Sequence, residues 1–270
     1  MDQKILLALN SLTYNHWWVK ILPLFGNNAL LRGGPVFFAL VLVWFARSEL
    51  EHQIKVLAGL VATMLATVIS VALQFLFTPH IRPFMDTALP INTKTADLGD
   101  LGLHRLSSFP SDSASLYFAV CTIIFFENRK LGIACGIWAF LTVGVCRVAL
   151  GYHYPSDIIG ALVLGPGLVL ISSKIGLIQE FCAALVHRFH ISIPVRTALM
   201  FLFLGEAYNQ FLGVLGLAHI IRRIIGLLAI YGAIHHRMLI LIALLTTVLI
   251  SVALVMPLVR RRDPQGSNDT

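Results

Sequence analysis

The sequence has 270 residues, of which 57% are hydrophobic and only 12% are charged. Soluble domains average about 45–50% apolar and about 25% charged residues, so this composition excludes an ordinary soluble protein. Lipid must be the solvent for much of the apolar surface. The formal net charge of +7 comes from Lys and Arg at the ends of apolar segments, which is typical of membrane orientation. No basic stripe with interleaved aromatic residues occurs, so we predict no nucleic-acid partner.

The apolar segments predict an all-α, polytopic membrane bundle. The stretch 3–25 is interrupted by polar residues beside Trp17 and Trp18, which favours a helix lying in the membrane interface. A crossing helix needs about 20 mainly apolar residues. The segments that approach this length are 34–47, 56–77, 113–127, 131–149, 156–173, 197–217 and 238–258. A second interfacial helix is predicted at about 219–236.

Alternation of these segments sorts the connections onto two faces. One face holds the loops near 48–55, 127–130 and 174–196, and the tail after 258. This face is rich in Lys and Arg, and the positive-inside rule makes it cytoplasmic. The 78–112 loop and the 147–155 connection then share the outward face. We therefore expect these two polar regions to meet there.

Arginine and serine residues in these outward regions indicate a phosphate site. The guanidinium groups of Arg82 and Arg147 are suited to bidentate binding of phosphate oxygens and stay charged at any working pH. Ser111 follows a proline and is typical of a helix start. Helix N-termini attract anions through free N–H groups and the helix dipole.

His153 and Asp157 lie four positions apart across a second helix start. A carboxylate there can accept a hydrogen bond from one imidazole nitrogen and leave the other nitrogen free to attack phosphorus. This is the logic of a catalytic triad applied to phosphoryl transfer. Neither the histidines nor the four cysteines have metal-ligand spacing, so we predict no metal and no cofactor.

Three motifs resemble those of a known family, the type 2 phosphatidic acid phosphatase superfamily. They are Arg82-Pro83, Phe109-Pro110-Ser111, and Gly151 to Asp157 preceded by Arg147. That family includes bacterial undecaprenyl-diphosphate phosphatases and vanadium haloperoxidases. The resemblance spans roughly residues 8–175. It implies a phosphatase-like membrane core in 1–175, followed by a helical extension with a short basic tail in 176–270.

The resemblance also implies roles for individual residues. His153 is similar to the family's nucleophile, which forms a phosphohistidine, and Asp157 to its partner. Arg82, Ser111 and Arg147 resemble the phosphate ligands. The family's phosphatases usually work without a metal.

The chain departs from the family pattern at three positions. The family has a lysine at the position of Phe75, a histidine that protonates the leaving group at Ser113, and a serine at Cys146. The missing acid matters most, because general-acid catalysis contributes about 10²–10⁴-fold.

Three explanations remain open for the missing acid. The substrate can be a lipid diphosphate, whose leaving group is a phosphate monoester with a second pKa of about 6. Another residue can donate the proton, and the candidates are His104, His80 and Asp112. Alternatively, the chain has lost hydrolysis and only binds or helps to transport lipid phosphates.

We therefore predict a membrane lipid phosphatase that acts on a lipid phosphate or diphosphate, with polyprenyl diphosphate favoured. The expected location is a bacterial inner membrane, with the site on the periplasmic face. The alternative is a lipid-phosphate-binding or transport-related protein on the same scaffold. The sequence makes no prediction of oligomeric state.

Overall fold

The computed structural model describes residues 1–76, 81–93 and 107–208. The chain forms two compact units, Met1–Glu180 and Phe181–Thr270. The predicted segments 219–236 and 238–258, and the candidate donors His80 and His104, lie outside the described residues. The assignment of separate roles to 1–175 and 176–270 stays a prediction.

The described part of the chain is helical, and its long helices agree with the predicted segments to within several residues. Residues 177–188 form a helix within the connection 174–196, which the sequence predicted as a loop. The first unit contains α3 (Ala29–Ala46), α4 (Leu50–Leu76), α5 (Asp112–Glu127), α6 (Arg129–Ala139), a π-helical stretch (Phe140–Val145), α7 (Cys146–Ala149) and α8 (Pro155–Ile175). After α9 (Leu177–Arg188), the second unit continues with α10 (Ile193–Tyr208). Within the described residues, four helical stretches are long and apolar enough to cross a membrane: Ala29–Ala46, Leu50–Gln74, Arg129–Ala149 and Pro155–Ile175. The predicted polytopic helical membrane bundle is confirmed.

The N-terminal segment is not the single interfacial helix that the sequence predicted. It consists of α1 (Asp2–Asn10), a 3-10 turn (Ser11–Tyr14) and α2 (Trp18–Asn27). The hydroxyls of Ser11 and Thr13 each donate to a backbone carbonyl three residues back, at 2.6 Å. Such local bonds offer the backbone an alternative to the helix, which fits the interruption of the helix at this point.

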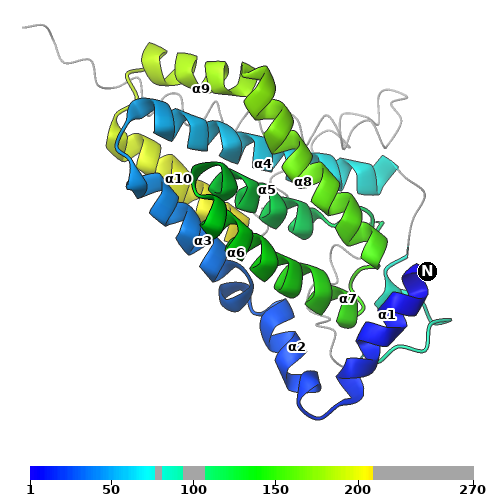
Figure 1. The fold of residues 1–270 in the computed structure, drawn as a ribbon. Coiled ribbons are helices and arrows are strands. Elements are labelled where there is room, and N and C mark those ends of the chain that lie inside the picture. The colour runs from blue at the N-terminus through cyan, green and yellow to red at the C-terminus, as the bar shows by residue number, and fades with distance from the viewer. Residues whose placement is uncertain (77–80, 94–106, 209–270) are drawn as a thin grey trace, which may run out of the picture. The chain divides into compact units, whose positions relative to one another are not determined.

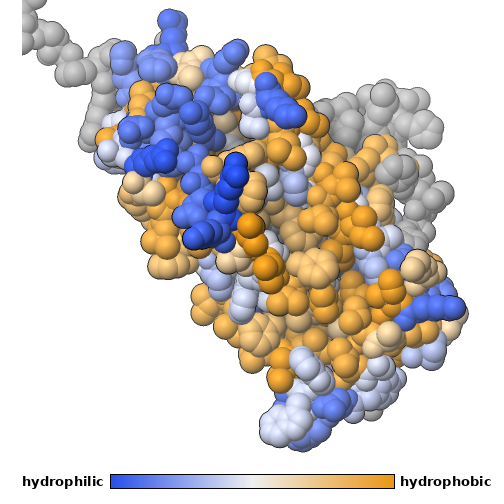
Figure 2. Space-filling model, in the orientation of Figure 1, coloured by the Kyte–Doolittle hydropathy of each residue, from blue (hydrophilic) through white to orange (hydrophobic). Residues whose placement is uncertain are grey.

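Helix α5 lies at the centre of the first unit, in contact with α3, α4, α6 and α8 (Figure 1). Small residues let its neighbours approach closely. A Cβ atom at Gly165 of α8 would lie 2.2 Å from the carbonyl oxygen of Ser115, and one at Gly132 would lie 2.3 Å from the Cα of Phe125. Figure 2 shows apolar side chains over the middle of the face that α6 and α8 present, as expected for a lipid-facing surface.

The two ends of the bundle gather the connections that alternation predicted. At one end, Nδ1 of His52 lies 3.2 Å from Oε2 of Glu127, which joins the first turn of α4 to the last turn of α5. At the other end, the end of α7, the beginnings of α5 and α8 and the short 3-10 turn Pro83–Met85 come together. The polar regions around 81–93, 107–112 and 147–157 therefore share one end of the bundle.

Candidate active site

His153 lies at the centre of this end and is fully buried. Its Nδ1 is 3.2 Å from the carbonyl oxygen of Ser108 and 3.4 Å from Oδ2 of Asp157. Both partners are acceptors, so Nδ1 carries the proton. Its Nε2 lies 3.1 Å from the hydroxyl oxygen of Ser111 and 3.5 Å from Nη1 of Arg82, and both of these groups can donate. The lone pair of Nε2 therefore faces two of the predicted phosphate ligands.

Asp157 is held in place by the start of α8. Its Oδ2 accepts a hydrogen bond from the backbone N–H of Tyr154 at 2.8 Å, in a capping arrangement at the helix N-terminus. The Ser108 side chain also hydrogen-bonds this carboxylate. Because the carboxylate is positioned by backbone and side chain, it can fix the tautomer and orientation of His153.

Ser111 is the N-cap of α5, and its hydroxyl accepts from the N–H of Ala114 at 3.4 Å. Its own N–H donates to the carbonyl of Asp157 at 3.2 Å, which ties the second motif to the third. The Gln74 side chain of α4 donates to the carbonyl of Pro110 at 2.8 Å. The peptide bond between Phe109 and Pro110 is cis. Two helices thus position the Ser111 hydroxyl beside His153.

Gly151 connects the first and third motifs. It has φ +79°, a left-handed conformation that glycine adopts without steric cost. Its carbonyl accepts from the N–H of Phe84 at 2.9 Å, two residues after Arg82. The Gly151 turn therefore holds Arg82 within reach of His153.

Arg82 and Arg147 are both buried, with 8% and 7% of their surfaces exposed. Neither forms an ion pair with a carboxylate among the described residues, and Nε of each has no hydrogen-bond partner there. The Arg147 guanidinium lies 5.0 Å from the centre of the Tyr152 ring, and the charges of Arg82 and Asp112 both act on it. Buried cations with so little compensation are costly, so this region is suited to an anionic ligand.

The electrostatics of the site keep His153 neutral. Burial lowers the pKa of His153 below its ordinary value of 6.5, and the nearby arginines act in the same direction. The hydrogen bond from Nδ1 to Asp157 opposes this shift without reversing it. A neutral imidazole with a free Nε2 lone pair is the form that can act as a nucleophile.

The other positions that the sequence analysis named belong to α4, α5 and α7. Asp112 is half-buried in the first turn of α5, and Ser113 beside it is buried. Cys146 is half-buried on α7, and Phe75 belongs to the last turn of α4. The position that holds a histidine in the family is therefore a buried serine, Ser113, in this chain.

Sequence reasoning missed two residues at the N-terminus of the chain. The Asp2 carboxylate accepts from the N–H of Ser156 at 3.0 Å, and the Asn10 side chain donates to the carbonyl of Ala149 at 2.8 Å. Asn10 also accepts from the N–H of Asn92 at 2.8 Å. Helix α1 therefore packs against the end of α7 and the start of α8 (Figure 1). A polar residue in an apolar stretch was the only signal of these contacts in the sequence.

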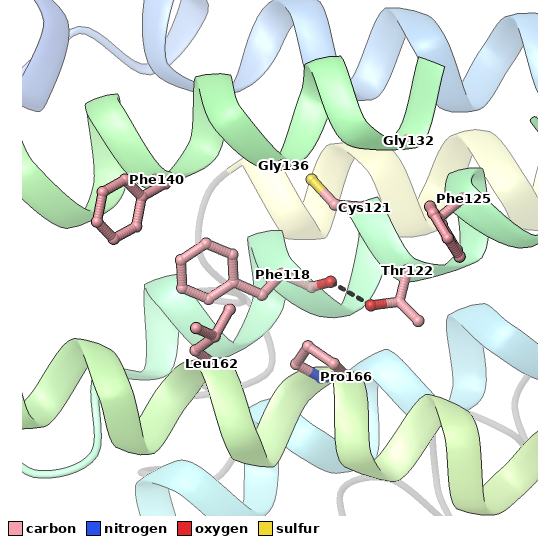
Figure 3. A pocket seen from close by; sticks show the side chains of 9 residues that line it. All are labelled: Phe118, Cys121, Thr122, Phe125, Gly132, Gly136, Phe140, Leu162 and Pro166. Carbon is pink, nitrogen blue, oxygen red and sulfur yellow. Dashed lines mark hydrogen bonds between the residues drawn. The ribbon is translucent and has the colours of Figure 1, made fainter. Parts of the chain in front are cut away.

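An apolar cavity of about 260 Å³ lies elsewhere in the bundle, between α5, α6 and α8 (Figure 3). It is lined by Phe118, Cys121, Thr122, Phe125, Gly132, Gly136, Phe140, Leu162 and Pro166. The Thr122 hydroxyl already donates to the carbonyl of Phe118 at 2.8 Å. This lining has no charged side chain that could bind a phosphate.

Comparison with known proteins identifies the family. The model of the PAP2 superfamily matches residues 36–177. The chain belongs to the PAP2 superfamily. The match begins later than the residue 8 at which the sequence motifs placed the resemblance, so α1 and α2 lie outside it.

The relatives found by sequence include phosphatases and a protein named for transport. Undecaprenyl-diphosphatase BcrC of Bacillus subtilis is 30% identical over 172 residues, which cover 61% of this chain and 78% of the relative. The bacitracin transport permease protein BcrC of Bacillus licheniformis is 29% identical over 127 residues, or 47% of this chain and 57% of the relative. A lipid A 1-phosphatase of Rhizobium etli is 38% identical over 75 residues, which cover 27% of this chain and 31% of the relative. No solved structure matches the chain.

Proposed function

We propose that this PAP2 protein is a lipid phosphatase that hydrolyses a lipid diphosphate, with His153 as the nucleophile. The observation that carries the proposal is the orientation of the imidazole. Its Nδ1 is held by Ser108 and Asp157, while Nε2 faces Arg82 and Ser111. The similarity to an undecaprenyl-diphosphatase supports the choice of a diphosphate.

The proposed reaction has two steps. Nε2 of His153 attacks the terminal phosphorus, and the bond from phosphorus to the bridging oxygen breaks, so that the lipid leaves as a monophosphate. Asp157 stabilises the cationic phosphohistidine through Nδ1. Water then attacks the phosphohistidine, which releases inorganic phosphate and restores the neutral imidazole. Arg82, Arg147 and the N-terminal end of α5 stabilise the phosphoryl oxygens throughout.

The departure at Ser113 favours a diphosphate over a monoester. Hydrolysis of a monoester expels an alkoxide, which needs a proton. Hydrolysis of a diphosphate expels a phosphate monoester, whose second pKa is about 6. This leaving group is stable without a dedicated acid. Where a proton is needed, Asp112, His80 and His104 remain the candidate donors.

The positive charges outside the site favour an outward orientation. The end of the bundle opposite His153 carries four basic residues, Arg47, Lys55, Arg129 and Lys130. By the positive-inside rule, that end faces the cytoplasm. We therefore place the site on the periplasmic face of a bacterial inner membrane.

The same scaffold supports a second function, because the usual proton donor is missing and one relative is named as a transport permease. In that case the chain binds lipid phosphates without hydrolysing them. A phosphate-release assay on the purified protein separates the two functions. Its substrates are farnesyl diphosphate, undecaprenyl diphosphate and phosphatidic acid, and its control is the His153→Ala variant.

We expect release from the diphosphates that depends on His153 and exceeds release from phosphatidic acid. Equal release by wild type and His153→Ala on every substrate would overturn the catalytic assignment. Faster turnover of phosphatidic acid would overturn the leaving-group argument. Unchanged rates in His104→Ala or Asp112→Asn would remove that residue as a proton donor. Saturable binding without any release would favour the binding function.

A further inference from the structure

A third buried arginine lies near the site and has no place in the proposed reaction. Arg32 belongs to the first turn of α3 and is only 5% exposed. Its Nη1 donates to the carbonyl of Gly26 at 3.2 Å, while its Nε has no partner in the described structure. The guanidinium lies 6.0 Å from the centre of the Tyr117 ring. It forms no ion pair with a carboxylate among the described residues.

Several contacts place Arg32 beside the turn that carries Arg147. Its carbonyl accepts from the indole N–H of Trp138 at 3.3 Å and from the hydroxyl of Thr142 at 3.5 Å. Its hydrogen-bond partner Gly26 packs so closely on Cys146 that an added Cβ would lie 3.4 Å from the Cys146 Cβ. Cys146 immediately precedes Arg147, and the charge of Arg32 acts on Arg147.

The position of Arg32 is electrostatically unfavourable without a ligand. A cation in the first turn of a helix lies near the positive end of the helix dipole, and the charge of this one also acts on Arg147. Among the described residues, Asp112 is the carboxylate whose charge acts on Arg147, and Asp157 is already bound to His153. The compensation that the described carboxylates give to these buried cations is therefore small. An additional anionic group would compensate this charge.

A diphosphate supplies more negative charge than a monophosphate. In the proposed reaction, Arg82 and Arg147 bind the phosphate that His153 attacks, which leaves the second phosphate without a cation. Arg32 is a further buried cation, and its charge acts on Arg147 from α3.

We propose that Arg32 binds the second phosphate of a diphosphate headgroup and thereby selects diphosphates over monophosphates. This inference rests on the proposed function, because it assumes that the first phosphate lies at His153. A charge-assisted hydrogen bond to phosphate corresponds to about a tenfold to hundredfold change in affinity. We expect the effect to be specific to diphosphates, because the second phosphate is the group that Arg32 is proposed to bind.

The test measures binding separately from catalysis. In purified His153→Ala protein, titration calorimetry compares pyrophosphate with orthophosphate. Adding Arg32→Gln is expected to weaken pyrophosphate binding by about tenfold or more, and orthophosphate binding by less than about threefold. Arg32→Lys keeps the charge and is expected to recover part of the loss. The matched control is Arg196→Gln, which changes a buried arginine of the second compact unit that also donates to a backbone carbonyl.

Thermal unfolding separates binding from a purely structural role. If Arg32→Gln is too unstable to titrate, the ratio of the two affinities is measured in Arg32→Lys, which is expected to fall below the wild-type ratio. An equal loss for both probes, or no loss for either, would overturn the inference. A kinetic version of the test keeps His153 intact. It compares the ratio of the KM values for farnesyl diphosphate and farnesyl phosphate between the wild type and the Arg32 variants. If turnover depends on His153 but the KM ratio is unchanged, the role of Arg32 is rejected and the proposed hydrolysis stands. If pyrophosphate binding depends on Arg32 but no turnover occurs, the proposed hydrolysis is rejected and the role of Arg32 stands.

Discussion

Nε2 of His153 lies 3.5 Å from Nη1 of Arg82. A protonated imidazole would therefore place two positive charges in contact inside a buried site. The arginine that is proposed to bind the phosphate thus also keeps the proposed nucleophile neutral. Loss of either residue therefore changes both phosphate binding and the protonation of the site.

Burial lowers the pKa of His153 below 6.5, and Arg82 contributes in the same direction. Only the neutral imidazole attacks phosphorus, so activity persists as the pH falls through 6.5 and is lost at the lower pKa. We expect the acidic limb of kcat/KM for farnesyl diphosphate to have its midpoint below pH 6.5. In Arg82→Gln the repulsion is removed, so the midpoint moves upward. A wild-type midpoint at or above the ordinary value would contradict the assignment.

Asp157→Asn tests the tautomer of His153. An amide can donate to Nδ1, which places the imidazole proton on Nε2 and blocks the attack. We expect kcat to fall by about 10²–10⁴-fold with little change in KM. The matched control is Asp86→Asn, which alters a carboxylate at the same end of the bundle that accepts from the N–H of Ala88 at 3.0 Å. Similar losses in both variants would argue against a specific role for Asp157.

Arg147→Met tests the cost of a buried cation. The arginine has no carboxylate partner in the described structure, so replacing it with an apolar side chain removes a desolvated charge. We expect the free energy of unfolding to rise by about 1–3 kcal/mol while phosphate release is lost. Thermal unfolding in detergent, with and without orthophosphate, measures both effects. Orthophosphate should stabilise the wild type and the exposed-site control Arg129→Met, but not Arg147→Met.

Gly165→Ala tests the close contact between α5 and α8. The new Cβ would lie 2.2 Å from the carbonyl oxygen of Ser115, so the two helices must separate. We expect a loss of about 1–3 kcal/mol in stability, together with lower activity, because Ser115 also donates to the carbonyl of Ser111 at 2.9 Å. Gly167→Ala on the same helix meets no atom within 4 Å. This control should be neutral or slightly stabilising, because alanine favours the helix.

Asp2→Ala tests whether α1 positions the site. The Asp2 carboxylate accepts from the first turn of α8, in the manner of a helix cap whose loss costs about 0.5–2 kcal/mol. We expect a destabilisation of this size and a fall in kcat, since α8 carries Asp157. The exposed neighbour Gln3→Ala is the control. Comparable stability and kcat in the two variants would show that α1 is dispensable for the site.

Much of the fold and of the candidate site was predictable from local patterns. The length of an apolar segment reflects the thickness of the membrane, so the helices later called α3 to α8 were found to within several residues. The chemistry of Arg82, His153 and Asp157 follows from their side chains, and the alternation of segments brought them to one end. Serine and proline at 110–111 and 155–156 marked the two helix starts.

Contacts between distant parts of the chain decided the rest. Asn10 binds Ala149 and Asp2 binds Ser156 across 139 and 154 positions, and no periodicity encodes such a pairing. For the same reason, the sequence position of Arg32 gives no sign that its charge acts on Arg147, which depends on the packing of α3. The orientation of the His153 ring likewise depends on the carbonyl of Ser108, 45 positions away. Local sequence specifies which groups are charged and which helices form, whereas the free energy of burying those charges together is a property of the packed bundle.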